Sequence, residues 1–185
     1  MAAGVASGVD RSQRVWHWKL DRSTPAVRRH VSCNRPADMK PSELRERTLR
    51  FAVRIHRFIQ PLLRQPDTRH VGMQLFRASS SVASNYRAAG LGRSRKEFAA
   101  KIGTVAEEAD ESLFWIVFLE RSRMLPRGHE AEMAALSGEA HELVKIFVAS
   151  YRTVKRRLRE ARRRKEAAKT AKSPDAPPAD APMAR

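Results

Sequence analysis

The stretch SRKEFAAKIGTVAEEADESLFWIVFLER, residues 94–121, carries the strongest local folding signal in the chain. Ser94 and Glu97 begin it with the spacing of a capping box, in which each side chain accepts a hydrogen bond from the other residue's backbone amide. Apolar or small side chains then recur at every third or fourth position, the period of a helix packed in a bundle. The stretch predicts an amphipathic helix that ends near Arg123, before the breaker LPRG at 125–128. We call the row of side chains expected on the buried face of a helix its seam. The seam of this helix comprises Phe98, Ile102, Val105, Ala109, Ser112 or Leu113, Ile116 and Leu119.

Three further segments show the same period. The first, about 42–64, is predicted to be capped by Ser42 and ended by Pro61. The second covers about 67–89, and the third starts near residue 128 or 129. Their seams are Leu44, Thr48, Phe51, Ile55, Phe58 and Leu62; Val71, Leu75, Ala78, Val82, Tyr86 and Ala89; and Met133, Leu136, Ala140, Leu143, Phe147, Ser150 or Tyr151, Val154 and Leu158.

Short links join these four segments, and helices joined by short links pack as antiparallel neighbours. The predicted fold class is therefore all-α: an antiparallel up-and-down four-helix bundle over 41–154, followed by a basic helical extension at 155–172. Residues 1–40 are interpreted as disordered, or as a mis-annotated segment upstream of a true start at Met39. Residues 173–185 are interpreted as a disordered Pro/Ala tail.

Serines are unusually frequent in the second predicted helix, at 79–85. Serine is a weak helix former because its hydroxyl competes for backbone hydrogen bonds, so the run predicts a close approach to a neighbouring helix. A serine nucleophile is the alternative, but no histidine with a carboxylate partner sits at a recognisable elbow. In the link that follows, Gly90 and Gly92 are expected to take positive φ.

Folding the second and third helices back on each other places Arg77 near Glu107 and Arg87 near Glu97, which predicts cross-helix ion pairs. The alternative role for the acidic residues is a carboxylate metal site, but no Glu-x-x-His pair occurs in the chain. We therefore expect no metal and no cofactor. The predicted interhelical polar residues are Arg77, Asn85, Glu107, Glu108 and Glu111, and Asp110 completes the acidic group.

Three aromatic residues, Phe114, Trp115 and Phe118, cover more of the 94–121 helix than one seam needs. A helix that is apolar on several sides must be buried on several sides. This predicts either a place at the bundle centre or a subunit interface, with an ordinary core as the simpler alternative.

Basic residues dominate the chain, with 37 Lys and Arg against 20 Asp and Glu, a net charge of +17. The excess is densest at 154–185, which holds 11 basic and 4 acidic residues. Such an excess attracts polyanions by counterion release, although solubility alone is an alternative explanation. The candidate nucleic-acid-binding residues are Arg87, Arg93, Arg95, Lys96, Lys101, Arg156, Arg157, Arg159, Arg162, Arg163 and Arg164.

The sequence also predicts a compartment. It contains no apolar run of the roughly 20 residues that would span a bilayer and no secretory signal, so a cytoplasmic protein is expected. A single cysteine, Cys33, suits a reducing compartment. Arg-rich residues 1–38 would also suit an organelle presequence, but three aspartates there weaken that interpretation.

The motifs QLFRASSSVASNYRAA at 74–89 and RSRKEF at 93–98, continuing through AAKIG and VAEEADE to Trp115, resemble a known family. The chain is similar over about 40–154 to the bacterial four-helix bundle proteins related to the 23S ribosomal RNA intervening-sequence protein. The resemblance implies a small homo-oligomer, commonly a ring of five, with no established enzyme activity. Some relatives resemble the accessory protein of diversity-generating retroelements, which has a basic nucleic-acid-binding surface. Many relatives carry Ala-Glu-Gly at the end of the second helix, whereas this chain has Ala88-Ala89-Gly90.

Two functional hypotheses follow from the sequence. The first is a non-enzymatic oligomeric bundle that binds RNA or DNA through backbone contacts, with no membrane involved. The alternative is a protein-protein adaptor that docks on a polymerase or ribonucleoprotein partner. Co-purification of a partner that survives nuclease and high salt would distinguish the alternative from the first.

Overall fold

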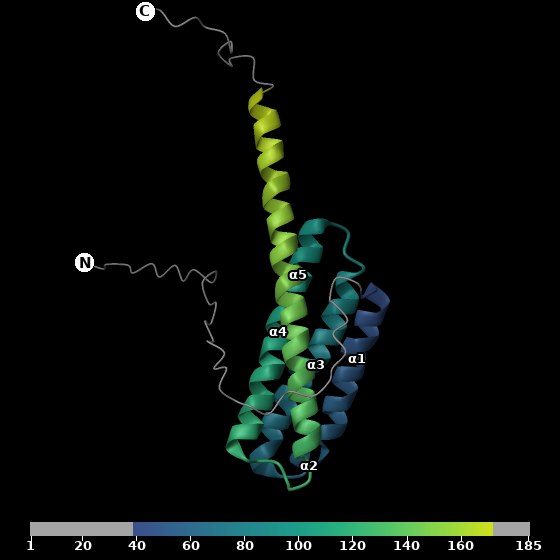
Figure 1. The fold of residues 1–185 in the computed structure, drawn as a ribbon, viewed down its shortest axis with the longest axis vertical. Helices are drawn as coiled ribbons and strands as arrows, with labels where there is room; N and C mark the ends of the chain where they lie inside the picture. The colour runs from purple at the N-terminus through teal and green to yellow at the C-terminus, as the bar shows by residue number, and fades with distance from the viewer. Residues whose placement is uncertain (1–38, 172–185) are drawn as a thin grey trace, which may run out of the picture. The chain divides into compact units, whose positions relative to one another are not determined.

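The computed structural model describes residues 39–171, which form five helices and no strand (Figure 1). The four long helices run alternately up and down, so the predicted all-α antiparallel bundle is confirmed. No helix of this part is long and apolar enough to cross a membrane. The predictions for 1–38 and 172–185 lie outside the described residues. The helices are α1 (Pro41–Phe58), α2 (Gln60–Leu63), α3 (Pro66–Ala89), α4 (Arg95–Ser122) and α5 (Glu130–Ala171).

Two predictions about helix ends were wrong. Ser42 does not cap α1: Lys40 is the N-cap, and its amide donates to Glu43 Oε2 over 3.3 Å. Because proline's fixed φ suits the first helical position, α1 begins at Pro41, as the predicted bundle boundary had it. Gly90 has a φ of −66°, and Gly92 does not have a positive φ either.

Positive φ occurs instead in the connection between α4 and α5, at Arg123 (53°) and Gly128 (93°). At Gly90 the missing side chain leaves room for a neighbouring residue. A Cβ there would collide with the Arg45 guanidinium of α1. The contact is with the far end of an exposed, flexible side chain, so a Cβ at Gly90 would displace the Arg45 guanidinium and not the backbone of α1.

Most residues of the predicted seams form the bundle core, but Tyr86, Phe98, Met133, Val154 and Leu158 are only half-buried. Phe51, Leu75, Leu119 and Phe147 are at most 2% exposed and come from the four long helices. At the ambiguous position on α4, Ser112 is buried and Leu113 is only half-buried. The remaining fully buried large side chains are Ile55, Ile59, Leu62, Val82, Ile102, Ile116, Leu136 and Leu143.

Small hydroxyl residues lie inside the core, and each donates to a backbone carbonyl. Ser79 donates to the Phe76 carbonyl at 3.1 Å, and Ser112 donates to the Glu108 carbonyl at 2.8 Å. Both serines are fully buried, so their hydroxyls need these bonds. The burial of Ser79 fits the expected close approach of helices.

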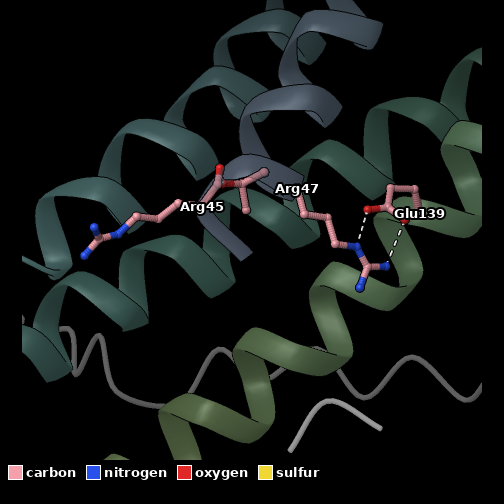
Figure 2. A network of polar contacts seen from close by, with 4 residues as sticks. Arg45, Arg47 and Glu139 are labelled. Carbon is pink, nitrogen blue, oxygen red and sulfur yellow. Dashed lines mark hydrogen bonds and ion pairs between the residues drawn. The ribbon is translucent and has the colours of Figure 1, made fainter. Parts of the chain in front are cut away.

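The α1–α5 contact is reinforced by a two-bond ion pair. Figure 2 shows Arg47 reaching from α1 to Glu139 on α5, with Nε donating to Oε1 at 2.6 Å and Nη2 donating to Oε2 at 2.9 Å. This hydrogen bond raises the pKa of Arg47. The predicted ion pairs Arg77–Glu107 and Arg87–Glu97 are not among those of residues 39–171.

We expect the Arg47–Glu139 pair to stabilise the bundle measurably. Its side chains are each 22% exposed, and two-bond geometry in a partly buried setting strengthens an ion pair. A double-mutant cycle with R47A and E139A, followed by urea unfolding, should give a coupling free energy of about 1 kcal/mol. The matched control is Arg54–Glu132, whose side chains are 41% and 45% exposed and which should give less than about 0.5 kcal/mol. Equal couplings for the two pairs would contradict this reasoning.

Candidate nucleic-acid interface

The last part of α5 continues beyond the ends of the other helices (Figure 1). Phe147 is the last buried residue on α5. Within 155–171 every residue is exposed except Leu158 and Ala161, which are half-buried. We call residues 155–171 the α5 extension. It holds nine basic and two acidic side chains. A helix with so few buried residues and such a net positive charge is available to an anionic partner.

Two ion pairs lie within the α5 extension. Arg162 Nε is 2.7 Å from Glu166 Oε1, and Arg156 Nε is 3.9 Å from Glu160 Oε1. The arginine side chains are 82% and 71% exposed, so these contacts are weak and screened by salt. The other arginines of the extension make no ion pair within the described chain. Most of the positive charge is therefore free to meet phosphates.

The turn between α3 and α4 adds a second basic group at the same end of the bundle. A Cβ at Gly103 would lie 3.0 Å from the Tyr151 ring, so α5 passes the early turns of α4 just before its extension begins. Arg87, Arg93 and Arg95, together with Lys96, are exposed around this turn. The predicted basic residues of the turn and the α5 extension therefore lie at one end.

Lys101 differs from the other predicted binding residues. Its side chain is half-buried, and its Nζ donates to Asn85 Oδ1 over 3.5 Å, joining α4 to α3. Asn85 in turn donates from Nδ2 to the Ser81 carbonyl at 3.0 Å. Lys101 therefore contributes mainly to the contact between α4 and α3, and less to the exposed basic surface.

The cap of α4 has one difference from its predicted form. Ser94 Oγ accepts from the Glu97 amide at 3.1 Å as expected, but Glu97 Oε2 accepts from the Arg93 amide at 3.0 Å and not from that of Ser94. The carboxylate therefore binds the backbone of the turn. Glu97 belongs to none of the ion pairs of residues 39–171.

Two hollows combine predicted binding residues, Arg87 in one and Arg156 and Arg159 in the other, with basic residues that the sequence did not single out. A groove of about 380 Å³ between α1 and α3 is lined by Arg45, Ser80 and Arg87 among others. A hollow of about 300 Å³ at the base of the α5 extension is lined by Arg152 and Lys155 with Tyr151. Lys155 Nζ lies 5.0 Å from the Tyr151 ring centroid. The one sequence signal for this contact is the four-residue spacing of the two side chains.

The acidic group on α4 contains two carboxyl groups with shifted pKa values. Burial, with smaller effects from Glu111 and Glu107, raises the pKa of Glu108, and the charge of Arg77 opposes this increase. Burial also raises the pKa of Asp110. Within residues 39–171 no three His, Cys, Asp or Glu side chains are placed to hold a metal ion.

The raised pKa of Glu108 predicts a pH dependence of stability. The pKa of Glu108 is about 4.5 in the unfolded chain and higher in the folded chain. At pH values between the two, the folded chain binds more protons than the unfolded chain. The contribution of Glu108 to the free energy of unfolding therefore falls as pH rises above about 4.5. Glu108→Gln should therefore raise the melting temperature at neutral pH, and the gain should vanish at acid pH. Thermal unfolding at several pH values measures this, with exposed Glu46→Gln as the control. A gain that persists at acid pH would show another cause.

The three aromatic residues of α4 form a cluster on the surface, not at the bundle centre. Phe114 is 55% exposed and Phe118 is 38% exposed. Trp115 contacts both rings edge-on, at centroid distances of 5.0 and 5.7 Å, and its Nε1 donates to Glu111 Oε1 at 3.2 Å. Of the two predicted roles, the subunit interface is compatible with this exposure.

No protein-family model matches this chain, and no curated protein matches it. Among solved structures, a similar one is the crystal structure of a protein of unknown function from the S23 ribosomal protein family of Bacteroides thetaiotaomicron VPI-5482. The similarity covers 62% of this chain and 99% of that chain, with 24% sequence identity and a TM-score of 0.55. The two chains share a fold. The S23-family protein supports the bundle architecture, and its function is unknown.

Proposed function

We propose that this chain is a non-enzymatic, self-associating four-helix bundle that binds RNA or DNA through a basic surface. That surface consists of the α5 extension and the exposed basic residues of the α3–α4 turn. The observation that carries the proposal is the α5 extension itself, a helix with nine basic side chains and almost no buried surface. These residues form a helix that adds little to the core, which favours a role in binding.

The chemistry of the surface favours contacts with the sugar-phosphate backbone. Lys and Arg that neutralise phosphates release condensed counterions, which supplies affinity without sequence information. Sequence-specific contacts need side chains fixed against base edges, whereas the extension's arginines are long and exposed. We therefore expect weak sequence preference.

The shared fold with the S23-family protein supports the sequence resemblance to the 23S ribosomal RNA intervening-sequence family. We place this chain in that family as part of the proposal, nearer to the branch that reads Asn-Tyr-Arg-Ala-Ala, the sequence this chain has at 85–89. The family placement agrees with a binding role and involves no catalytic step.

A salt titration tests the proposed function. The affinity of the purified chain for RNA and DNA of mixed sequence is measured by fluorescence anisotropy at increasing salt. The logarithm of the binding constant should fall linearly with the logarithm of salt, with a slope of about −0.9 per phosphate contacted in duplex DNA. Absence of binding at low salt, or binding that ignores salt, would refute the proposal. In that case, a protein partner retained through nuclease and high-salt washes would favour the adaptor.

The exposed aromatic cluster supports self-association, because exposed apolar patches often mark protein interfaces. We expect the double substitution F114S/F118S to lower the mass measured by light scattering without changing helical content. The control is Leu91→Ser, which removes an apolar side chain that is 78% exposed on the α3–α4 turn. An unchanged mass in F114S/F118S would exclude this cluster from the interface.

A further inference from the structure

We propose that the α5 extension inserts lengthwise into the major groove of duplex DNA and contacts phosphates of both strands. This inference rests on the proposed function and adds the form of the nucleic acid and the way in which the helix docks. Three features of the extension support it: the distribution of charge around the helix, its dimensions and its rigid attachment to the bundle.

Positive charge lies on two sides of the extension. At 3.6 residues per turn, Arg159 and Arg163 lie on one side, close to the line of Lys155. Arg157 and Arg164 are seven residues apart, so they share another side, about 130° around the helix axis from Arg159 and Arg163. All five side chains are exposed. A helix lying on a single phosphate backbone would use one charged side, whereas a helix between two backbones uses both.

The dimensions of the extension fit one groove in particular. At 1.5 Å per residue, residues 155–171 are about 25 Å long, and a helix with its side chains is about 10 to 12 Å wide. The major groove of B-form DNA is about 12 Å wide and admits an α-helix. The major groove of duplex RNA is too narrow and deep for side chains to read. Duplex DNA is therefore the better match.

Single-stranded nucleic acid fits the extension less well. Proteins that hold single strands usually stack the bases on aromatic side chains. Residues 155–171 contain no aromatic residue. The nearest ring, Tyr151, is half-buried beside Gly103 and has Lys155 above it, so its accessible face is limited.

The bundle fixes the direction of the extension. It is continuous with the part of α5 that packs in the core, and Tyr151 holds its base against Gly103 of α4. A helix that is already formed and oriented loses less conformational entropy on binding than a flexible tail. Arg93 and Arg95, on the α3–α4 turn at the same end of the bundle, are exposed and available to flanking phosphates.

The first test compares two pairs of substitutions with equal charge loss in the full chain. R159Q/R163Q removes charge from one side and R157Q/R164Q removes it from the other. Affinity is measured by fluorescence anisotropy for a DNA duplex of about two helical turns. Each pair should lower affinity by a similar factor, about tenfold or more at low salt. A loss confined to one pair would overturn groove insertion and indicate contact with one face.

The second test keeps the charge and removes the rigid helix. Ala161→Pro interrupts the extension beyond the core, because proline lacks the amide donor. It should weaken binding to duplex DNA by about tenfold if a helix of defined shape is recognised. Unchanged affinity in A161P would overturn the inference, since a flexible basic tail would then suffice.

The choice of probes separates this inference from the proposed function. The unsubstituted chain should bind the DNA duplex more tightly than an RNA duplex or a single strand of the same sequence. Equal or tighter binding to RNA duplex or single strand would overturn groove insertion and leave nucleic-acid binding intact. Failure to bind all three probes at low salt would refute the proposed function as well.

Discussion

Replacing six arginines of the α5 extension with glutamine should lower the affinity for nucleic acid at least about 100-fold at low salt. Each removed phosphate contact also reduces the slope of log affinity against log salt by about one, so the salt dependence should flatten. The fold should survive, because these side chains are exposed beyond the last buried residue of α5. The six positions are Arg156, Arg157, Arg159, Arg162, Arg163 and Arg164.

The bundle offers a control with the same loss of charge. Six exposed arginines outside the α5 extension and the α3–α4 turn can be replaced with glutamine in the same way. This control should keep affinity within about threefold, apart from the small long-range effect of net charge. Equal losses in the two variants would mean that net charge, and not the extension, determines binding. The control positions are Arg50, Arg57, Arg64, Arg69, Arg77 and Arg127.

Phe147→Ala should lower the free energy of unfolding by about 3 to 5 kcal/mol. Phe147 is 0% exposed, and its ring centroid lies 5.2 Å from that of Tyr86 on α3. Deleting the ring leaves a cavity that close-packed neighbours fill only in part. Urea unfolding measures the loss as a shift of the midpoint at constant slope.

The matched control is Phe118→Ala on the surface of α4. Its side chain is 38% exposed, so the same deletion should cost less, about 1 kcal/mol. The measurement uses dilute protein, because self-association would add to apparent stability. A loss below about 1 kcal/mol for Phe147→Ala would show that the core around α5 is loosely packed.

Much of the architecture was predictable because it depends on local pattern. The spacing of Phe51, Leu75, Ile102 and Leu143 placed each of them on the buried side of its helix. The Ser94 cap was predictable because its hydrogen bond spans three residues of one chain segment. The basic extension was visible for the same reason, since charge density along α5 needs no knowledge of neighbours.

Apart from the helix ends, the errors concern contacts between helices. Sequence spacing paired Arg77 with Glu107, whereas the ion pairs between helices join Arg47 to Glu139 and Arg54 to Glu132. Periodicity defines a face relative to its own helix axis, but rotation and register between helices select the partner. Gly90 illustrates this limit, because the Arg45 side chain that lies where a Cβ at Gly90 would be comes from another helix.

The sequence by itself determined the four helices, their buried faces and the location of the positive charge, because these properties follow from the order of residues along one helix. Only the tertiary structure decided that Arg47 pairs with Glu139 across helices, and that Phe114 is exposed. Both facts depend on how helices pack side by side. Packing is a property of complementary surfaces, which periodicity alone leaves open.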